Sequence, residues 1–106
     1  EISDSLVGLR SQIADGVCIR NSILMGADYY DRPGVPLPGG IPIGVGPNSE
    51  IEGAIIDKNV RMGAGIVIKP FPRGTEIDSG NWVVQDGIVV IPKSSILHAG
   101  TYIGPD

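Results

Sequence analysis

Two of the three lysines in the sequence occupy matching positions. Lys58 stands two residues after Ile56, and Lys93 stands two residues after Ile91. If both isoleucines point into a core, both lysines leave the chain near a corner and point outward. Such an ammonium group, flanked by Arg61, could hold a phosphate group as a point charge. From the spacing alone, two solvated surface lysines are the simpler interpretation.

The elements that must position these lysines repeat along the chain. Residues 51–68 align without a gap on residues 2–19, so that Ile51 meets Ile2. Aliphatic residues recur every six positions at Val7, Ile13, Ile19 and Met25, at Ile56, Met62 and Ile68, and at Ile91, Leu97 and Ile103. A period of six fits neither an α-helix nor a simple alternating strand. It fits the short strands of a parallel β-helix, in which three hexapeptides make one coil of about eighteen residues.

The whole chain, residues 1–106, is expected to form a single domain of about three to four coils. Repeats are predicted at about residues 1–25, 41–68 and 88–104. Two segments, at about 26–40 and 69–87, are rich in Pro and Gly and break the period, so both are predicted to be external loops.

A hairpin is expected where the second loop returns to the coils. The apolar segments 82–84 and 88–91 flank Asp86 and Gly87. Asp-Gly is a dipeptide typical of tight β turns, so the two segments are predicted to pair.

The other reactive side chains predict no catalytic or metal-binding site. His98 is the only histidine, and because it follows the inward Leu97 it is expected at an exposed corner. Hexapeptide-repeat acyltransferases use a histidine as general base, and trimeric β-helix carbonic anhydrases hold zinc with three histidines. One histidine and the distant Cys18 cannot form that zinc site within one chain. Cys18 is expected to be a small strand residue with no activating neighbour.

Charge and composition limit the partners of the chain. Twelve acidic residues against eight basic ones give a net charge of −4, whereas surfaces that bind nucleic acid are ordinarily basic. One cysteine excludes an internal disulfide framework and suits a reducing compartment. No apolar run is long enough to span a bilayer. We expect neither nucleic acid nor a membrane as a partner.

Three stretches carry a specific resemblance to a known family: Met25 to Tyr30, Pro42 to Gly46 and Ile55 to Gly63. With them, the sequence resembles the C-terminal domain of ADP-glucose pyrophosphorylase (glucose-1-phosphate adenylyltransferase), and it is most similar to the plant and cyanobacterial forms. The similarity covers nearly the whole chain. It implies an all-β fold, a left-handed parallel β-helix, and the spacing argument does not supply that handedness.

The resemblance also implies where the chemistry occurs. In this family an N-terminal nucleotidyltransferase domain joins ATP and glucose 1-phosphate, with Mg²⁺, to give ADP-glucose and pyrophosphate for starch or glycogen synthesis. We expect that domain to be absent from this chain, which begins directly in repeat sequence and so suggests a piece of a longer protein. No catalysis and no cofactor are expected here. The expected partners are the protein's own N-terminal catalytic domain, the other subunits of a tetramer and phosphorylated effectors.

The same resemblance gives the lysines a role. Lys58 in Ile-Ile-Asp-Lys-Asn and Lys93 in Val-Val-Ile-Pro-Lys match lysines that the plant-type family uses for 3-phosphoglycerate and competing phosphate, and Arg61 is a weaker candidate. The expected location is the plastid stroma or, alternatively, the cytoplasm of a cyanobacterium. The competing hypotheses are a hexapeptide-repeat acyltransferase and a purely structural oligomerisation β-helix.

Overall fold

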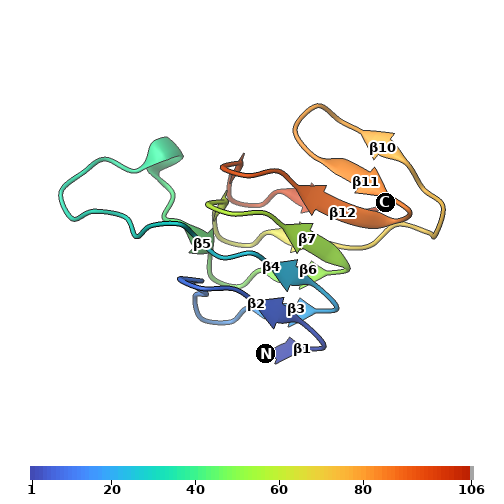
Figure 1. Ribbon diagram of the computed structural model, residues 1–106, viewed down its shortest axis with the longest axis horizontal. Helices are drawn as coiled ribbons and strands as arrows, with labels where there is room; N and C mark the ends of the chain where they lie inside the picture. The colour runs from blue at the N-terminus through green and yellow to red at the C-terminus, as the bar shows by residue number, and fades with distance from the viewer. Residues whose placement is uncertain (106) are drawn as a thin grey trace.

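The chain winds into a parallel β-helix whose coils stack from the N-terminus, at the bottom of Figure 1, toward the C-terminal part above it. In this computed structural model residues 1–105 are described, and Asp106, the last residue of the predicted domain, lies outside the described residues. The strands are short, and successive coils extend three faces. Within residues 1–105 no helix is long and apolar enough to cross a membrane.

The first face is a five-stranded parallel sheet. In spatial order its strands are β1 (Ile2–Ser3), β3 (Cys18–Arg20), β6 (Glu50–Glu52), β9 (Val67–Ile68) and β14 (Tyr102–Ile103). One isoleucine from each strand stands in register along the sheet: Ile2, Ile19, Ile51, Ile68 and Ile103. All except Ile2, at the open end, are 2% exposed or less. This column of β-branched side chains forms the middle of the core.

The second and third faces complete each coil. The second face is a six-stranded sheet of β10 (Ile77–Asp78), β11 (Val83–Gln85), β12 (Ile88–Ile91), β7 (Ala54–Ile56), β4 (Ile23–Leu24) and β2 (Leu6–Val7). The third face is a three-stranded sheet of β13 (Ile96–Leu97), β8 (Arg61–Met62) and β5 (Gly44–Val45). A single bridge from Ile13 to Val45 extends the third face into the first coil. The strands β2, β4, β7 and β12 pair in parallel and belong to four successive coils, so the predicted β-helix is confirmed.

The corner between the first and second faces is one residue shorter than the other two corners. The inward positions on these faces are five residues apart, as from Ile19 to Leu24. The six-residue period predicts Met25 at the inward position, and this prediction is wrong. Leu24 pairs with Ile56 and is 5% exposed, whereas Met25 is 43% exposed. The short corner turns at one left-handed residue, Asn21 (φ 50°), so a strict period of six slips by one position there.

Two long connections leave the coils and project from opposite sides of the stack (Figure 1). The first runs from β4 to β5 and contains η1 (Pro38–Gly40), a short 3-10 helix. The second runs from β9 to β12 and contains β10 and β11. Each connection replaces a corner between two faces, the second and third faces for the first connection and the first and second faces for the second. The strands on either side therefore keep their register with the neighbouring coils.

The predicted hairpin is confirmed in the second connection. β11 and β12 pair in antiparallel register, with Val83 opposite Val90. Asp86 and Gly87 form the turn with positive φ angles of 49° and 81°, as a two-residue hairpin turn of the favoured type requires. β10 adds a third antiparallel strand, which the sequence did not predict.

Two neighbouring substitutions test the corrected register. Leu24→Ala removes a buried side chain and should lower the free energy of unfolding by about 2–4 kcal/mol. Met25→Ala changes the adjacent exposed side chain and should cost less than about 1 kcal/mol. Urea denaturation of the two variants and the wild type measures both values. A larger loss for Met25→Ala than for Leu24→Ala would contradict this register.

Candidate functional site

Lys58 and Lys93 lie at the same corner of successive coils. The corner joins the second face to the third, and it follows β7 in one coil and β12 in the next, whose last residues are paired. The backbone is hydrogen-bonded across the corner, where the Ser94 N–H donates to the Lys58 carbonyl at 2.9 Å. Asn59 and Ser94, which follow the two lysines, have positive φ angles of 61° and 62°. The matching sequence positions therefore become matching positions in space.

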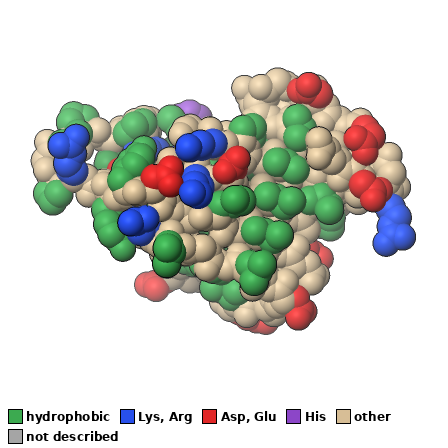
Figure 2. Space-filling view, viewed as in Figure 1, with side chains coloured by type: hydrophobic (Ala, Val, Ile, Leu, Met, Phe, Trp, Pro, Cys, Tyr) green, Lys and Arg blue, Asp and Glu red, His purple; other side chains and the backbone are tan. Residues whose placement is uncertain are grey.

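The two ammonium groups converge on one carboxylate. Lys58 Nζ lies 3.2 Å from Asp28 Oδ1, and Lys93 Nζ lies 3.5 Å from Asp28 Oδ2. The two lysine side chains are 43% and 58% exposed, so solutes can reach both. Basic and acidic side chains gather in the middle of the face that Figure 2 shows. The corner combines two positive charges and one negative charge at an accessible surface.

Asp28 is held by the turn that opens the first connection. Its N–H donates to Asn59 Oδ1 at 2.9 Å, and Asn59 Nδ2 donates to Asp28 Oδ2 at 3.2 Å. Asn59 is buried, and its own N–H donates to the Gly26 carbonyl at 3.1 Å. The hydrogen bond with Lys58, and next the one with Asn59, lowers the pKa of Asp28 below its ordinary value. Asp28 is therefore ionised at neutral pH, and the lysines are not alone in fixing its position.

Arg61 lies on a different carboxylate. Its side chain is buried, and its guanidinium donates hydrogen bonds of 2.7 and 3.2 Å to Asp31 and one of 2.8 Å to the Ile41 carbonyl. The Ile43 N–H also donates to Asp31, at 3.0 Å. These contacts fasten the first connection to β8 at two points, Asp31 and Ile41. The structure brings the two predicted lysines together and gives Arg61 a structural partner, so Arg61 stays the weaker prediction for effector binding.

Sequence reasoning named the lysines but missed the carboxylate between them. Asp28 and Asn59 are 31 residues apart in the chain, and Asp28 belongs to an irregular segment. The signal that could have found Asp28 is the register itself. Because Leu24 is equivalent to Ile56, Gly26 is equivalent to Lys58 in the next coil. The residues directly after Gly26, which include Asp28, must therefore lie beside the lysine corner.

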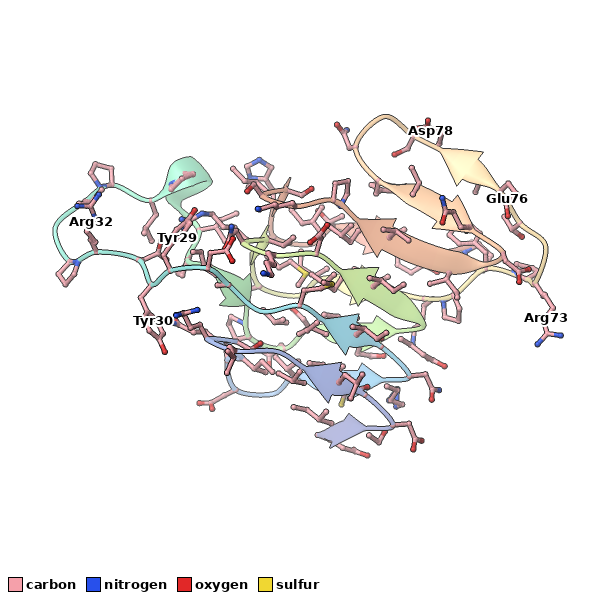
Figure 3. All side chains as sticks on the ribbon, in the orientation of Figure 1. Tyr29, Tyr30, Arg32, Arg73, Glu76 and Asp78 are labelled. Carbon is pink, nitrogen blue, oxygen red and sulfur yellow. The ribbon has the colours of Figure 1, made fainter. Side chains whose placement is uncertain are left out.

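The remaining candidates from the sequence lie apart as single residues. His98 is exposed after β13, as predicted, and Cys18 is a half-buried free thiol on β3. Among the described residues no group of three or more His, Cys, Asp and Glu side chains could hold a metal ion. Figure 3 shows Arg32 on the outer part of the first connection, and Arg73 and Glu76 on the second, at the opposite side of the coils. These three charges belong to the connections and not to the coils.

Comparison with known proteins gives a family and two close relatives. The family described as "GLGC left-handed parallel beta-helix domain" matches residues 1–102, which supplies the left-handed sense of the coils. The chain is 42% identical to the chloroplastic/amyloplastic small subunit of glucose-1-phosphate adenylyltransferase from Triticum aestivum, over 97% of this chain and 23% of that protein. It is also 42% identical to a small subunit of the same enzyme from Zea mays, over 97% of this chain and 88% of that protein. The chain therefore spans about a quarter of the wheat relative and most of the maize relative.

The pH dependence of stability tests the tie between Arg61 and Asp31. The hydrogen bonds from Arg61, and next the one from the Ile43 N–H, lower the pKa of Asp31. A carboxyl group with a lowered pKa stabilises the fold above its ordinary pKa of about 3.9, and this contribution is lost as the pH falls through the lowered pKa. At neutral pH, Asp31→Asn should therefore lower the free energy of unfolding by about 1–2 kcal/mol. The difference from the wild type should shrink below about pH 4.

Urea denaturation at a series of pH values measures this difference. Asp15→Asn is the matched control, because Asp15 is an exposed carboxylate on a corner of the first coil. The control should differ little from the wild type at any pH. A deficit for Asp31→Asn that stays constant into the acid range would show that the loss does not come from the ionised carboxylate.

Proposed function

We propose a function for this chain from the family to which it belongs, the GLGC left-handed parallel β-helix domains, and from the lysine corner. The chain is the C-terminal regulatory and assembly domain of a glucose-1-phosphate adenylyltransferase. Its regulatory site is the corner at which Lys58 and Lys93 meet. The convergence of these two ammonium groups, from residues 35 positions apart in the sequence, is the observation that carries the proposal. Family membership leaves the acyltransferase hypothesis without support.

The complete protein catalyses the transfer of the adenylyl group from ATP to glucose 1-phosphate. The name of both relatives supports this activity. The reaction releases pyrophosphate and gives ADP-glucose, the glucosyl donor for starch or glycogen. Its catalytic residues and its Mg²⁺ belong to an N-terminal nucleotidyltransferase domain outside the 106 residues. The designation of the wheat relative supports a plastid location, in the stroma, and a cyanobacterial cytoplasm is the alternative.

The chemistry of the corner suits a phosphorylated effector. An ammonium group binds phosphate as a compact point charge with three donors, and two such groups can share one phosphate. Both lysines are held on rigid backbone, and both side chains reach solvent. The ligand class is therefore a small phosphorylated anion, with 3-phosphoglycerate as the activator and inorganic phosphate as its competitor. Because the chain as a whole is acidic, this local basic site provides specific rather than general anion binding.

The outer surface of the second face supports the assembly role. Leu6, Ile23, Ile55 and Val90 stand in register across four coils and point away from the core. Leu6 is 68% exposed and Ile23 is 40% exposed, and Figure 2 shows hydrophobic side chains spread over this area. A contiguous apolar surface of this kind marks a contact with another protein surface. In the complete enzyme the surface contacts the N-terminal catalytic domain or a neighbouring subunit.

Activation of the complete enzyme by 3-phosphoglycerate tests the regulatory role. Lys58→Gln and Lys93→Gln each remove one charged contact with the effector, and such a contact contributes about 1.5–3 kcal/mol. The concentration of 3-phosphoglycerate for half-maximal activation should therefore rise about tenfold or more in each variant. The KM values for ATP and glucose 1-phosphate, measured without effector, should stay close to those of the wild type.

Lys69→Gln is the matched control for this experiment. Lys69 is the third lysine of the chain, and it directly follows β9 on the first face, with its Nζ 3.0 Å from Glu50 Oε1. Loss of the same charge there should leave activation unchanged. If Lys58→Gln and Lys93→Gln both respond to 3-phosphoglycerate as the wild type does, the two lysines are surface residues and the domain has a structural role only.

A further inference from the structure

We infer that Asp28 is a built-in competitor for the lysine corner: it occupies both ammonium groups in the unliganded domain, and a phosphorylated anion must draw them away from it. The inference rests on the proposed regulatory function of Lys58 and Lys93, and it adds the residue that sets how tightly and how selectively the corner binds.

The geometry shows a site that is already occupied. One carboxylate oxygen of Asp28 lies within ion-pair distance of each lysine, at 3.2 Å and 3.5 Å. The two oxygens of a single carboxylate therefore stand where two oxygens of a phosphate group would bind. An anion that binds both ammonium groups therefore competes with Asp28 for their positive charge.

Asp28 is the fixed member of this cluster, and the lysines are the mobile members. The preceding coil holds the segment that carries Asp28, because the Ala27 N–H donates to the Leu9 carbonyl at 2.9 Å and Arg10 Nη1 donates to the Ala27 carbonyl at 3.2 Å. The buried side chain of Asn59 holds both the N–H and the carboxylate of Asp28. The lysines reach Asp28 through flexible four-carbon chains that are about half exposed. When an anion binds, the ammonium groups move and the negative charge of Asp28 stays beside them.

This arrangement selects for anions with more than one negative charge. When a ligand with a single carboxylate binds, the lysines only exchange the carboxylate of Asp28 for that of the ligand. The ligand therefore gains little binding free energy over this intramolecular partner. A phosphate monoester carries about −1.5 to −2 charges at pH 7 and three acceptor oxygens, so it attracts the two ammonium groups more strongly than Asp28 does. Displacing Asp28 also costs free energy, which keeps the affinity for the effector moderate. With a moderate affinity, the occupancy of the site changes when the effector concentration changes.

Titration of the complete subunit with inorganic phosphate tests the role of Asp28. Asp28→Asn removes the competing charge, and its amide oxygen can still accept the hydrogen bond from Asn59 Nδ2. Isothermal titration calorimetry at low ionic strength should show phosphate binding about three- to tenfold tighter in Asp28→Asn than in the wild type, the effect expected for one screened charge at contact distance. Asp15→Asn, which removes an exposed charge elsewhere, should bind phosphate as the wild type does. The double variant Lys58→Gln/Lys93→Gln identifies any binding outside the corner.

The outcomes separate this inference from the proposed function. If phosphate binding depends on the two lysines but is equal in Asp28→Asn and the wild type, Asp28 is not a competitor, while the regulatory site stands. If the double lysine variant binds phosphate as well as Asp28→Asn does, the corner is not an anion site and both proposals fail. Equal tightening in Asp15→Asn and Asp28→Asn would reveal an effect of net charge alone and would also overturn the inference.

A second measurement needs no substitution at Asp28: it follows the pKa of the Asp28 carboxyl group through its side-chain ¹³C resonance. The hydrogen bonds with Lys58 and Asn59 hold this pKa below its ordinary value. Sulfate stays a dianion throughout the titration range of a carboxyl group, so it serves as the probe here. Saturating sulfate should raise the pKa of Asp28, because the ammonium groups move to the anion and a negative charge arrives nearby. A pKa of Asp28 that sulfate leaves unchanged would contradict the competition.

Discussion

Where no long connection intervenes, successive coils turn their corners at equivalent residue positions, and the placement of side chains on the three faces follows from this register. Backbone hydrogen bonds join each corner to the next, as from Ser94 to Lys58. A left-handed residue such as Asn59 lets the chain turn sharply without breaking that ladder. Side chains at equivalent positions are then held at the strand spacing of about 4.8 Å. Two lysines 35 positions apart in the chain can therefore share one carboxylate.

The anchor of the first connection and the candidate effector site form one structure. Asp28 meets the two lysines where the connection leaves the coil, and Asp31 meets Arg61 three residues later. The chain has an excess of acidic residues. At this corner its carboxylates hold basic side chains in place. In the proposed function, these ammonium groups are also the ones that bind the effector. The proposed regulation and the local structure therefore depend on the same few charges.

The parts of this arrangement that follow a local or periodic rule could be predicted from the sequence. The six-residue period predicted the inward columns and the matching positions of the lysines, and Asp-Gly predicted the hairpin between β11 and β12. The period misplaced Met25, because the corner before it is one residue shorter. The corrected register would have placed Asp28 beside the lysine corner, directly after Gly26. The contact of Arg61 with Asp31 could not be predicted, because it depends on the path of an irregular segment about thirty residues away in the chain.

A crystal structure of the protein grown with phosphate would show what the lysine corner holds when an anion is present. We expect a phosphate group within hydrogen-bond distance of Lys58 Nζ and Lys93 Nζ, with at least one ammonium group moved away from Asp28. Asp28 itself should stay on Asn59. A corner with no phosphate and with both lysines still paired to Asp28, in crystals that bind phosphate elsewhere on the molecule, would show that the corner is not an anion site.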